Sequence, residues 1–139
     1  MIKTGKRKEW RSTCLRNMMM DYTQCTVLVA DDDRDIVRAI ATLLEQEGLT
    51  VLRAYNGLEA LEAVAEHPVS LILIDVMMPK LDGLSAMMKI REQKNIPILI
   101  LSAKSEESDK ILGLSMGADD YIAKPFHPQE LRIQIESGL

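Results

Sequence analysis

Residues 26–54, TVLVADDDRDIVRAIATLLEQEGLTVLRA, place two strand-like runs on either side of a segment with helical periodicity. The first run, Thr26–Ala30, is unbroken and rich in β-branched residues, which is typical of a strand covered on both faces. The second run is Thr50–Ala54, and Gly48 stands where a helix before it would end. Between the runs, apolar residues recur on one helix face: Ile36, Val37, Ile40, Leu43 and Leu44. This stretch predicts a strand–helix–strand unit.

The same alternation continues along the rest of the chain. Further strands are predicted at Leu71–Ile74, at Pro97–Leu101 and around Tyr121–Ile122. The intervening helices are expected to begin after Asn56, after the Pro79/Gly83 loop, after Ser105 and at Glu130. Five such units predict an α/β fold, in which a doubly wound, five-stranded parallel sheet is covered by five helices.

Composition and charge limit the function classes. The chain has 139 residues, 47% of them hydrophobic, which suits one domain. No stretch approaches the ~18 apolar residues of a membrane span, so we expect no membrane association. Two cysteines are too few for a disulfide scaffold and indicate a reducing, cytoplasmic location.

The charge is distributed unevenly along the chain. Residues 1–21 carry six basic and two acidic residues, whereas the remainder has a net charge of −8. The acidic remainder is a poor nucleic-acid-binding surface. We expect residues 1–24 to be a basic, disordered N-terminal extension, with a basic arm for nucleic acid or anionic lipid as the alternative. Residues 25–139 are expected to form the folded domain.

Polar side chains follow four of the five predicted strands. They are Asp31, Asp32 and Asp33 after the first strand, Asp75 after the third, Ser102 after the fourth and Lys124 after the fifth. Parallel sheets bind ligands beyond the carboxyl ends of their strands, so we expect these groups to converge. Carboxylates that close repel one another, and a hard divalent cation such as Mg²⁺ relieves that repulsion.

This set of groups suits phosphoryl transfer. A carboxylate can act as the nucleophile and become an aspartyl phosphate. Lys124 supplies a positive charge for a phosphoryl oxygen, and Ser102 supplies a hydroxyl donor. Phosphoryl transfer depends mainly on positioning and charge neutralisation, which these residues offer.

Four segments in order resemble the motifs of response-regulator receiver domains of two-component systems, most closely the OmpR/PhoB (winged-helix) subfamily. They are VLVADDD at 27–33, LILIDVMMPKLDG at 71–83, LILSAK at 99–104 and GADDYIAKPF at 117–126. The resemblance covers about residues 25–139. It implies a flavodoxin-like sheet with strand order 2-1-3-4-5 and a phosphoacceptor, rather than an enzyme, that takes its phosphoryl group from a sensor histidine kinase on Asp75.

The resemblance also implies a role for each site residue. Asp32, Asp75 and the backbone carbonyl of Met77 would bind Mg²⁺ directly, and Asp31 would act through a metal-bound water. Lys124 would pair with the phosphoryl group, while Ser102, with Ala103 beside it, and Tyr121 would form the switch. Met77 and Lys104, two residues beyond Asp75 and Ser102, would flank the approaching water and make autodephosphorylation slow.

A dimer face is implied as well. Lys110, Asp119, Asp120 and Glu130 match the subfamily's ion-pairing positions, but Gln134 and Ser137 stand where two arginines would be. We therefore expect a weak homodimer on phosphorylation. The chain stops within the last predicted helix, so we expect DNA binding and transcriptional control only through an effector domain absent from this chain.

Two other functions compete with this interpretation. A haloacid-dehalogenase-like Mg²⁺-dependent phosphatase would also use an Asp-x-Asp motif, but Asp35 stands where that family has Thr or Val, and Lys124 follows the late acidic pair rather than preceding it. A receiver-like binding module that ignores phosphorylation is disfavoured by the intact residue set. Asp33 and Asp82 are interpreted as helix caps, and His67 and His127 as surface histidines.

Overall fold

A five-stranded parallel sheet forms the centre of the computed structural model, which describes residues 25–103, 113–115, 117–124, 127 and 129–131. The strands are β1 (Thr26–Ala30), β2 (Thr50–Ala54), β3 (Leu71–Asp75), β4 (Ile98–Ala103) and β5 (Asp120–Lys124). Their order is β2-β1-β3-β4-β5, with every neighbouring pair parallel. This order confirms the expected doubly wound, flavodoxin-like α/β fold.

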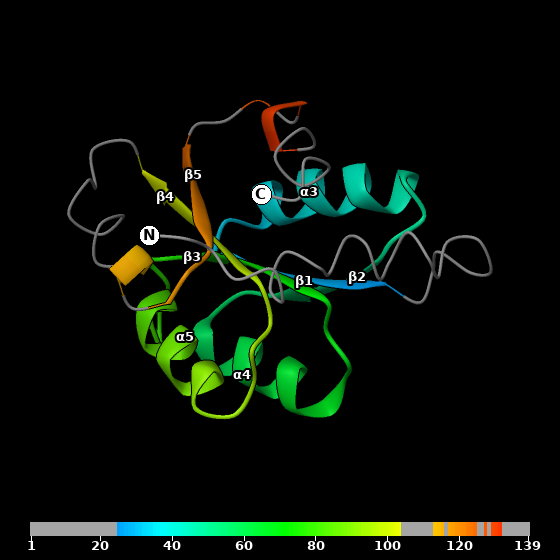
Figure 1. Ribbon diagram of the computed structural model, residues 1–139. Coiled ribbons are helices and arrows are strands. Elements are labelled where there is room, and N and C mark those ends of the chain that lie inside the picture. The colour runs from blue at the N-terminus through cyan, green and yellow to red at the C-terminus, as the bar shows by residue number, and fades with distance from the viewer. Residues whose placement is uncertain (1–24, 104–112, 116, 125–126, 128, 132–139) are drawn as a thin grey trace.

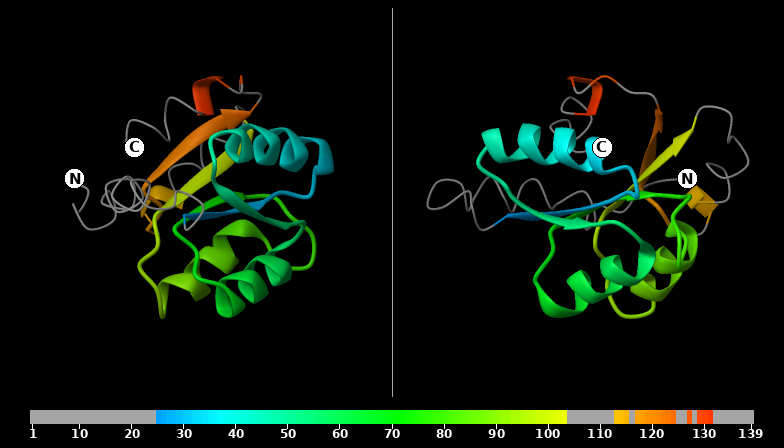
Figure 2. Two further views of the ribbon diagram at one scale, coloured as in Figure 1. Left: turned by 90° about the vertical axis from the view of Figure 1, so that its right-hand side faces the viewer. Right: turned by 180° about the vertical axis from the view of Figure 1, so that it is seen from behind.

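Helices cover both faces of the sheet. Figures 1 and 2 show α3 (Arg34–Gln46) on one face, and α4 (Gly57–Glu66) with α5 (Gly83–Arg91) on the other. Helical residues 113–115 and 129–131 lie where the fourth and fifth helices were expected. The predicted cap at Ser105 and the rest of the last helix lie outside the described residues.

Side-chain caps fix where each described helix begins. Asp33 accepts hydrogen bonds from Asp35 N and Ile36 N at the start of α3. Asn56 accepts from Glu59 N at 2.9 Å, and Asp82 accepts from Ser85 N at 2.8 Å. Each cap satisfies a helix amide that has no carbonyl partner within the helix. The cap assignments for Asp33, Asn56 and Asp82 are therefore confirmed.

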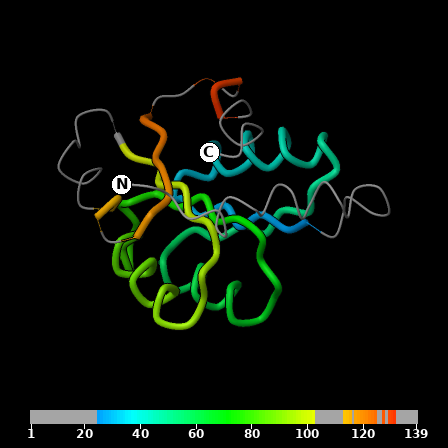
Figure 3. Tube along the Cα trace, in the orientation of Figure 1, coloured from blue at the N-terminus to red at the C-terminus, as the bar shows by residue number. Residues whose placement is uncertain are grey.

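Two apolar layers, one on each face of the sheet, make up the core. The Cα trace in Figure 3 shows the sheet lying between the helices that cover these layers. Along β1, Val27 and Val29 face the α3 layer, while Leu28 and Ala30 face the α4–α5 layer. All four side chains are fully buried. A strand buried on both faces reads as a continuous apolar run, which explains why the sequence pattern identified it.

Two strands extend further than predicted. β3 includes Asp75, which pairs with Leu101, and β4 continues to Ala103, which pairs with Lys124. Hydrogen bonding to neighbouring strands, rather than hydrophobicity, sets these ends. Asp75 and Ser102 are therefore held in strand geometry instead of standing in loops.

Among the described helices, none has the length and apolar content needed to cross a bilayer. Cys25 is buried at the base of β1 and is disulfide-bonded. Cys14, the other cysteine of the chain, lies outside the described residues. The cytoplasmic location expected from the sequence stays a prediction.

Candidate functional site

The candidate site lies at the carboxyl edge of the sheet. Asp31 directly follows β1, Asp75 ends β3 and Lys124 ends β5. β1 and β3 are neighbours, and the chain leaves them toward opposite faces of the sheet. This is the switch in strand order where doubly wound sheets bind ligands.

Lys124 bridges two buried carboxylates. Its Nζ lies 2.6 Å from Asp31 Oδ2 and 3.3 Å from Asp75 Oδ2. Asp31 is 0% exposed and Asp75 is 5% exposed, whereas Asp32 is open to solvent. One ammonium thus faces two carboxylates in a largely dehydrated place, and a third carboxylate lies at the entrance.

The donor set fits a divalent cation. Asp31, Asp32 and Asp75 each offer a carboxylate oxygen, and these oxygens lie within 4.8 Å of one another. Asp31 Oδ1 accepts a hydrogen bond from Asp33 N at 2.9 Å. Asp31 Oδ2 is buried and, although it touches Lys124, forms no hydrogen bond of good geometry within the described part of the chain. A buried acceptor left in this state suits a hard cation or its bound water.

Burial dominates the electrostatics of the site. The pKa of the Asp75 carboxyl is raised to about 6, chiefly by burial and then by the charge of Asp31, while Lys124 opposes both. Burial also raises the pKa of Asp31. Burial alone would lower the pKa of the Lys124 ammonium, but its contacts with Asp31 and Asp75 outweigh that effect and raise it. Asp75 therefore remains ionised at neutral pH.

The expected switch residues lie on the two adjacent strands. Ser102 is 3% exposed near the end of β4 and pairs in register with Ala123. Tyr121 pairs with Ile100 and is half-buried against the α4–α5 layer. Ala103 is the last residue of β4. Met77 is 63% exposed in the loop after β3, and Lys104 lies outside the described residues.

Asp119, a candidate residue of the dimer face, is buried within the chain. It is 3% exposed, its Oδ2 accepts a hydrogen bond from Ile98 N at 2.9 Å, and it pairs with Arg91 at 3.3 Å. Its carboxylate is thus committed within the chain. Sequence reasoning missed Arg91, because a basic residue in the last turn of a helix is an ordinary surface pattern.

The other dimer-face candidates are placed differently. Asp120 is half-buried at the start of β5 and accepts a hydrogen bond from Tyr121 N. Glu130 is exposed and accepts from His127 N at 2.8 Å. Lys110 lies outside the described residues.

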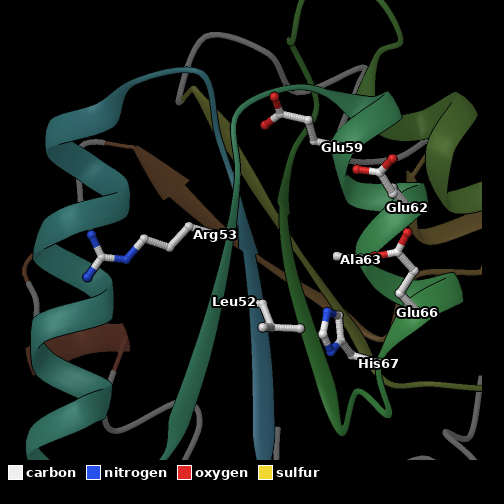
Figure 4. Close-up of a pocket in the computed structure, with 7 residues that line it drawn as sticks. All are labelled: Leu52, Arg53, Glu59, Glu62, Ala63, Glu66 and His67. Carbon is white, nitrogen blue, oxygen red and sulfur yellow. The ribbon is translucent and has the colours of Figure 1, made fainter.

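A separate hollow of about 260 Å³ lies between β2 and α4 (Figure 4). It is lined by Leu52, Arg53, Glu59, Glu62, Ala63, Glu66 and His67. Glu59 accepts a hydrogen bond from Tyr55 N at 2.8 Å, so part of this acidic surface serves the fold. None of the residues predicted to carry function lines this hollow, and His67, which does, was interpreted as a surface histidine.

Comparison with known families identifies this arrangement. The family model described as "Response regulator receiver domain" matches residues 27–136. The chain is a response-regulator receiver domain. A receiver domain belongs to a two-component system and is not a classical enzyme, so the phosphatase alternative is set aside. A receiver also implies a cognate histidine kinase, and the acidic triad is typical of the Mg²⁺-binding receiver site.

Several curated relatives are transcriptional regulators of the OmpR/PhoB family. The alkaline phosphatase synthesis transcriptional regulatory protein PhoP of Bacillus subtilis is 46% identical over 114 residues, which is 81% of this receiver and 48% of that protein. The CpxR homolog of Haemophilus influenzae is 45% identical over 113 residues, covering 81% of this chain and 49% of the relative. The chain spans about half the length of the curated relatives it matches.

Solved structures agree with the fold. The receiver domain of the Francisella response regulator 1452 is 43% identical, with a TM-score of 0.75 over 82% of this chain and 95% of that one. A putative response regulator from Chloroflexus aurantiacus is 36% identical, with a TM-score of 0.77 over 82% and 96% of the two chains. The receiver assignment therefore rests on sequence and structure together.

Proposed function

We propose that Asp75 accepts a phosphoryl group from a sensor histidine kinase in the presence of Mg²⁺. The observation that carries this proposal is the placement of Lys124 Nζ between Asp31 and Asp75, with oxygens of Asp31, Asp32 and Asp75 within 4.8 Å of one another. This cluster combines a nucleophilic carboxylate, a cation for phosphoryl oxygens and donors for a metal.

Each residue has a distinct task in this mechanism. Asp32, Asp75 and the Met77 carbonyl would hold Mg²⁺ directly, and Asp31 would hold it through a water. When bound, Mg²⁺ would neutralise charge on the phosphoryl oxygens. An ionised Asp75 oxygen attacks phosphorus, and the bond from phosphorus to the donor histidine nitrogen breaks. Lys124 then pairs with a phosphoryl oxygen.

The switch would involve the strands next to the site. The Ser102 hydroxyl would donate to a phosphoryl oxygen, and Tyr121 would move inward behind it. This pair would bias the face formed by residues 113–115, β5 and residues 129–131 between two arrangements. Because the matched relatives are about twice as long and are named transcriptional regulators, this face would control transcription through a DNA-binding domain outside the present chain.

Phosphorylation by a small donor tests the assignment. Acetyl phosphate with Mg²⁺ should add one phosphoryl group, detected by intact-protein mass spectrometry, and Asp75→Asn should abolish it. Asp82→Asn is the matched control, because Asp82 is a nearby aspartate that caps a helix. Undiminished labelling of Asp75→Asn would contradict the site, and no labelling of the wild type would favour a binding module that ignores phosphorylation.

A further inference from the structure

The loop from Val76 to Asp82 connects β3 to α5 and carries Met77. Gly83 N donates a hydrogen bond to Val76 O at 2.9 Å, which closes the loop on itself. Gly57 N donates to Leu81 O, also at 2.9 Å, and this bond ties the loop to a different element, the start of α4. The loop is therefore held at both ends by main-chain hydrogen bonds.

Gly57 is the first residue of α4, so its N–H has no carbonyl partner within the helix. The cap residue Asn56, which is 6% exposed, directs its side chain to Glu59 N instead. Leu81 O thus satisfies a helix-terminal amide that the side-chain cap leaves unsatisfied. This contact makes the position of the loop depend on the position of α4.

There is no room for a side chain at this contact. A Cβ on Gly57 would overlap Leu81 O and would lie 2.8 Å from both Leu81 C and Leu81 Cβ. These are main-chain atoms or the atom next to them, so the loop itself would have to move. Among the described glycines only Gly48 and Gly117 have positive φ, so close approach, rather than an unusual conformation, requires glycine here.

The loop also bears on the phosphoacceptor. The main-chain N–H of Met77 lowers the pKa of the Asp75 carboxyl, against the larger effect of burial, so the loop backbone lies close to this carboxylate. Displacing the loop would therefore disturb both the Asp75 carboxylate and the Met77 carbonyl, which are proposed to bind the same Mg²⁺ ion.

We propose that Gly57 is a positioning residue for the Mg²⁺ site, and this inference rests on the function proposed above. The Gly57 N–H and the absence of a side chain hold Leu81 in place. They thereby fix the position of the loop from which the Met77 carbonyl would bind Mg²⁺. Mutating a residue that orients the metal ligands without binding the metal itself typically lowers metal affinity by about 10–100-fold.

The first test compares two buried-glycine variants. Gly57→Ala should raise the Mg²⁺ dissociation constant, measured by calorimetry, by about tenfold or more. Gly113→Ala is the matched control, because its Cβ would meet only the ends of flexible side chains, overlapping Ile100 Cδ1 and lying 3.3 Å from Leu84 Cδ2, and no main-chain atom of the loop. Gly113→Ala should keep the wild-type affinity, even where both variants lower the melting temperature equally. Wild-type affinity in folded Gly57→Ala would overturn the inference.

The second test needs no variant. Coupling between two sites is reciprocal, so saturating Mg²⁺ should slow hydrogen exchange of the Gly57 amide in the wild type. The His67 amide, which donates to Ala63 O at the other end of α4, is the control and should change little. Unchanged exchange at Gly57 would overturn the inference. A wild type that binds no Mg²⁺ would overturn the proposed function together with it, whereas equal tight binding by wild type and Gly57→Ala overturns this inference alone.

Discussion

Two buried carboxylates at the carboxyl edge of the sheet, Asp31 and Asp75, lower the stability of the metal-free fold while serving the proposed site. Asp31 and Asp75 share one ammonium, and the pKa of Asp75 is raised to about 6 from an ordinary value of 3.8. A carboxyl whose pKa is raised by folding does not lower the free energy of unfolding well below pH 3.8, because there it is protonated in both the folded and the unfolded state. Stability is then lost as the pH rises from 3.8 through about 6, because the native state must ionise a buried group.

Asp75→Asn should therefore stabilise the metal-free protein at pH 7.5. The expected gain is on the order of 1–3 kcal/mol, because each pKa unit corresponds to about 1.4 kcal/mol. Urea unfolding at pH 7.5 and at pH 4 measures it, and the gain should shrink at the lower pH. A variant less stable than the wild type at pH 7.5 would show that the Asp75 charge is favourable in the native state.

We expect Met77 to control a second property at the residue scale, the lifetime of the aspartyl phosphate. Its side chain is 63% exposed beside the phosphoacceptor, where it should obstruct an in-line water. Met77→Asn should shorten the lifetime, measured as loss of the phosphorylated mass with time. Met88→Asn is the control, because Met88 is similarly exposed on α5 but lies outside the loop. Equal decay of all three proteins would count against water exclusion.

At the scale of elements, Arg91 fastens the end of α5 to the segment that leads into β5. Its guanidinium donates to Ile96 O at 2.6 Å and to Gly117 O at 3.1 and 3.2 Å, and it pairs with buried Asp119. Asp119 in turn accepts from the first amide of β4. The network therefore joins the last residue of α5, the start of β4 and the segment directly before β5.

Removing the guanidinium should leave Asp119 as an uncompensated buried charge. Arg91→Met should cost about 3 kcal/mol in the free energy of unfolding. Arg91→Lys should recover only part of this lost free energy, because an ammonium lacks the planar, forked set of donors with which the guanidinium reaches two carbonyls and a carboxylate. Chemical denaturation measures both variants. If Arg91→Lys is as stable as the wild type, the positive charge alone, and not the hydrogen bonds of the guanidinium, stabilises this region.

For the whole molecule, the expected property is weak self-association. Gln134 and Ser137 replace two arginines of the subfamily's dimer face, and Asp119 is buried against Arg91 in the same chain. Exposed ion pairs contribute about 0.2–1 kcal/mol each, so these changes should weaken a symmetric dimer without abolishing it.

Sedimentation of the phosphorylated protein tests this expectation. The wild type should be mainly monomeric and associate weakly, and Gln134→Arg should shift the equilibrium toward the dimer. A tight wild-type dimer that ignores this substitution would place the interface elsewhere.

Local sequence patterns were enough to predict the strands and helices and the edge of the sheet at which the site lies. Strands such as Thr26–Ala30 and caps such as Asp33 are specified by neighbours within a few residues, so local patterns reveal them. Asp31, Asp75 and Lys124 were predictable as a group because parallel strands bring their carboxyl ends to one edge.

Which side chains contact one another could be learned only from the folded chain. Lys124 sits between Asp31 and Asp75, Asp119 turns inward to Arg91, and Gly57 meets Leu81. Each of these contacts joins residues more than 20 positions apart, and no local periodicity encodes such a distance. Packing of the helices onto the sheet brings these atoms together, so their contacts follow from three-dimensional geometry alone.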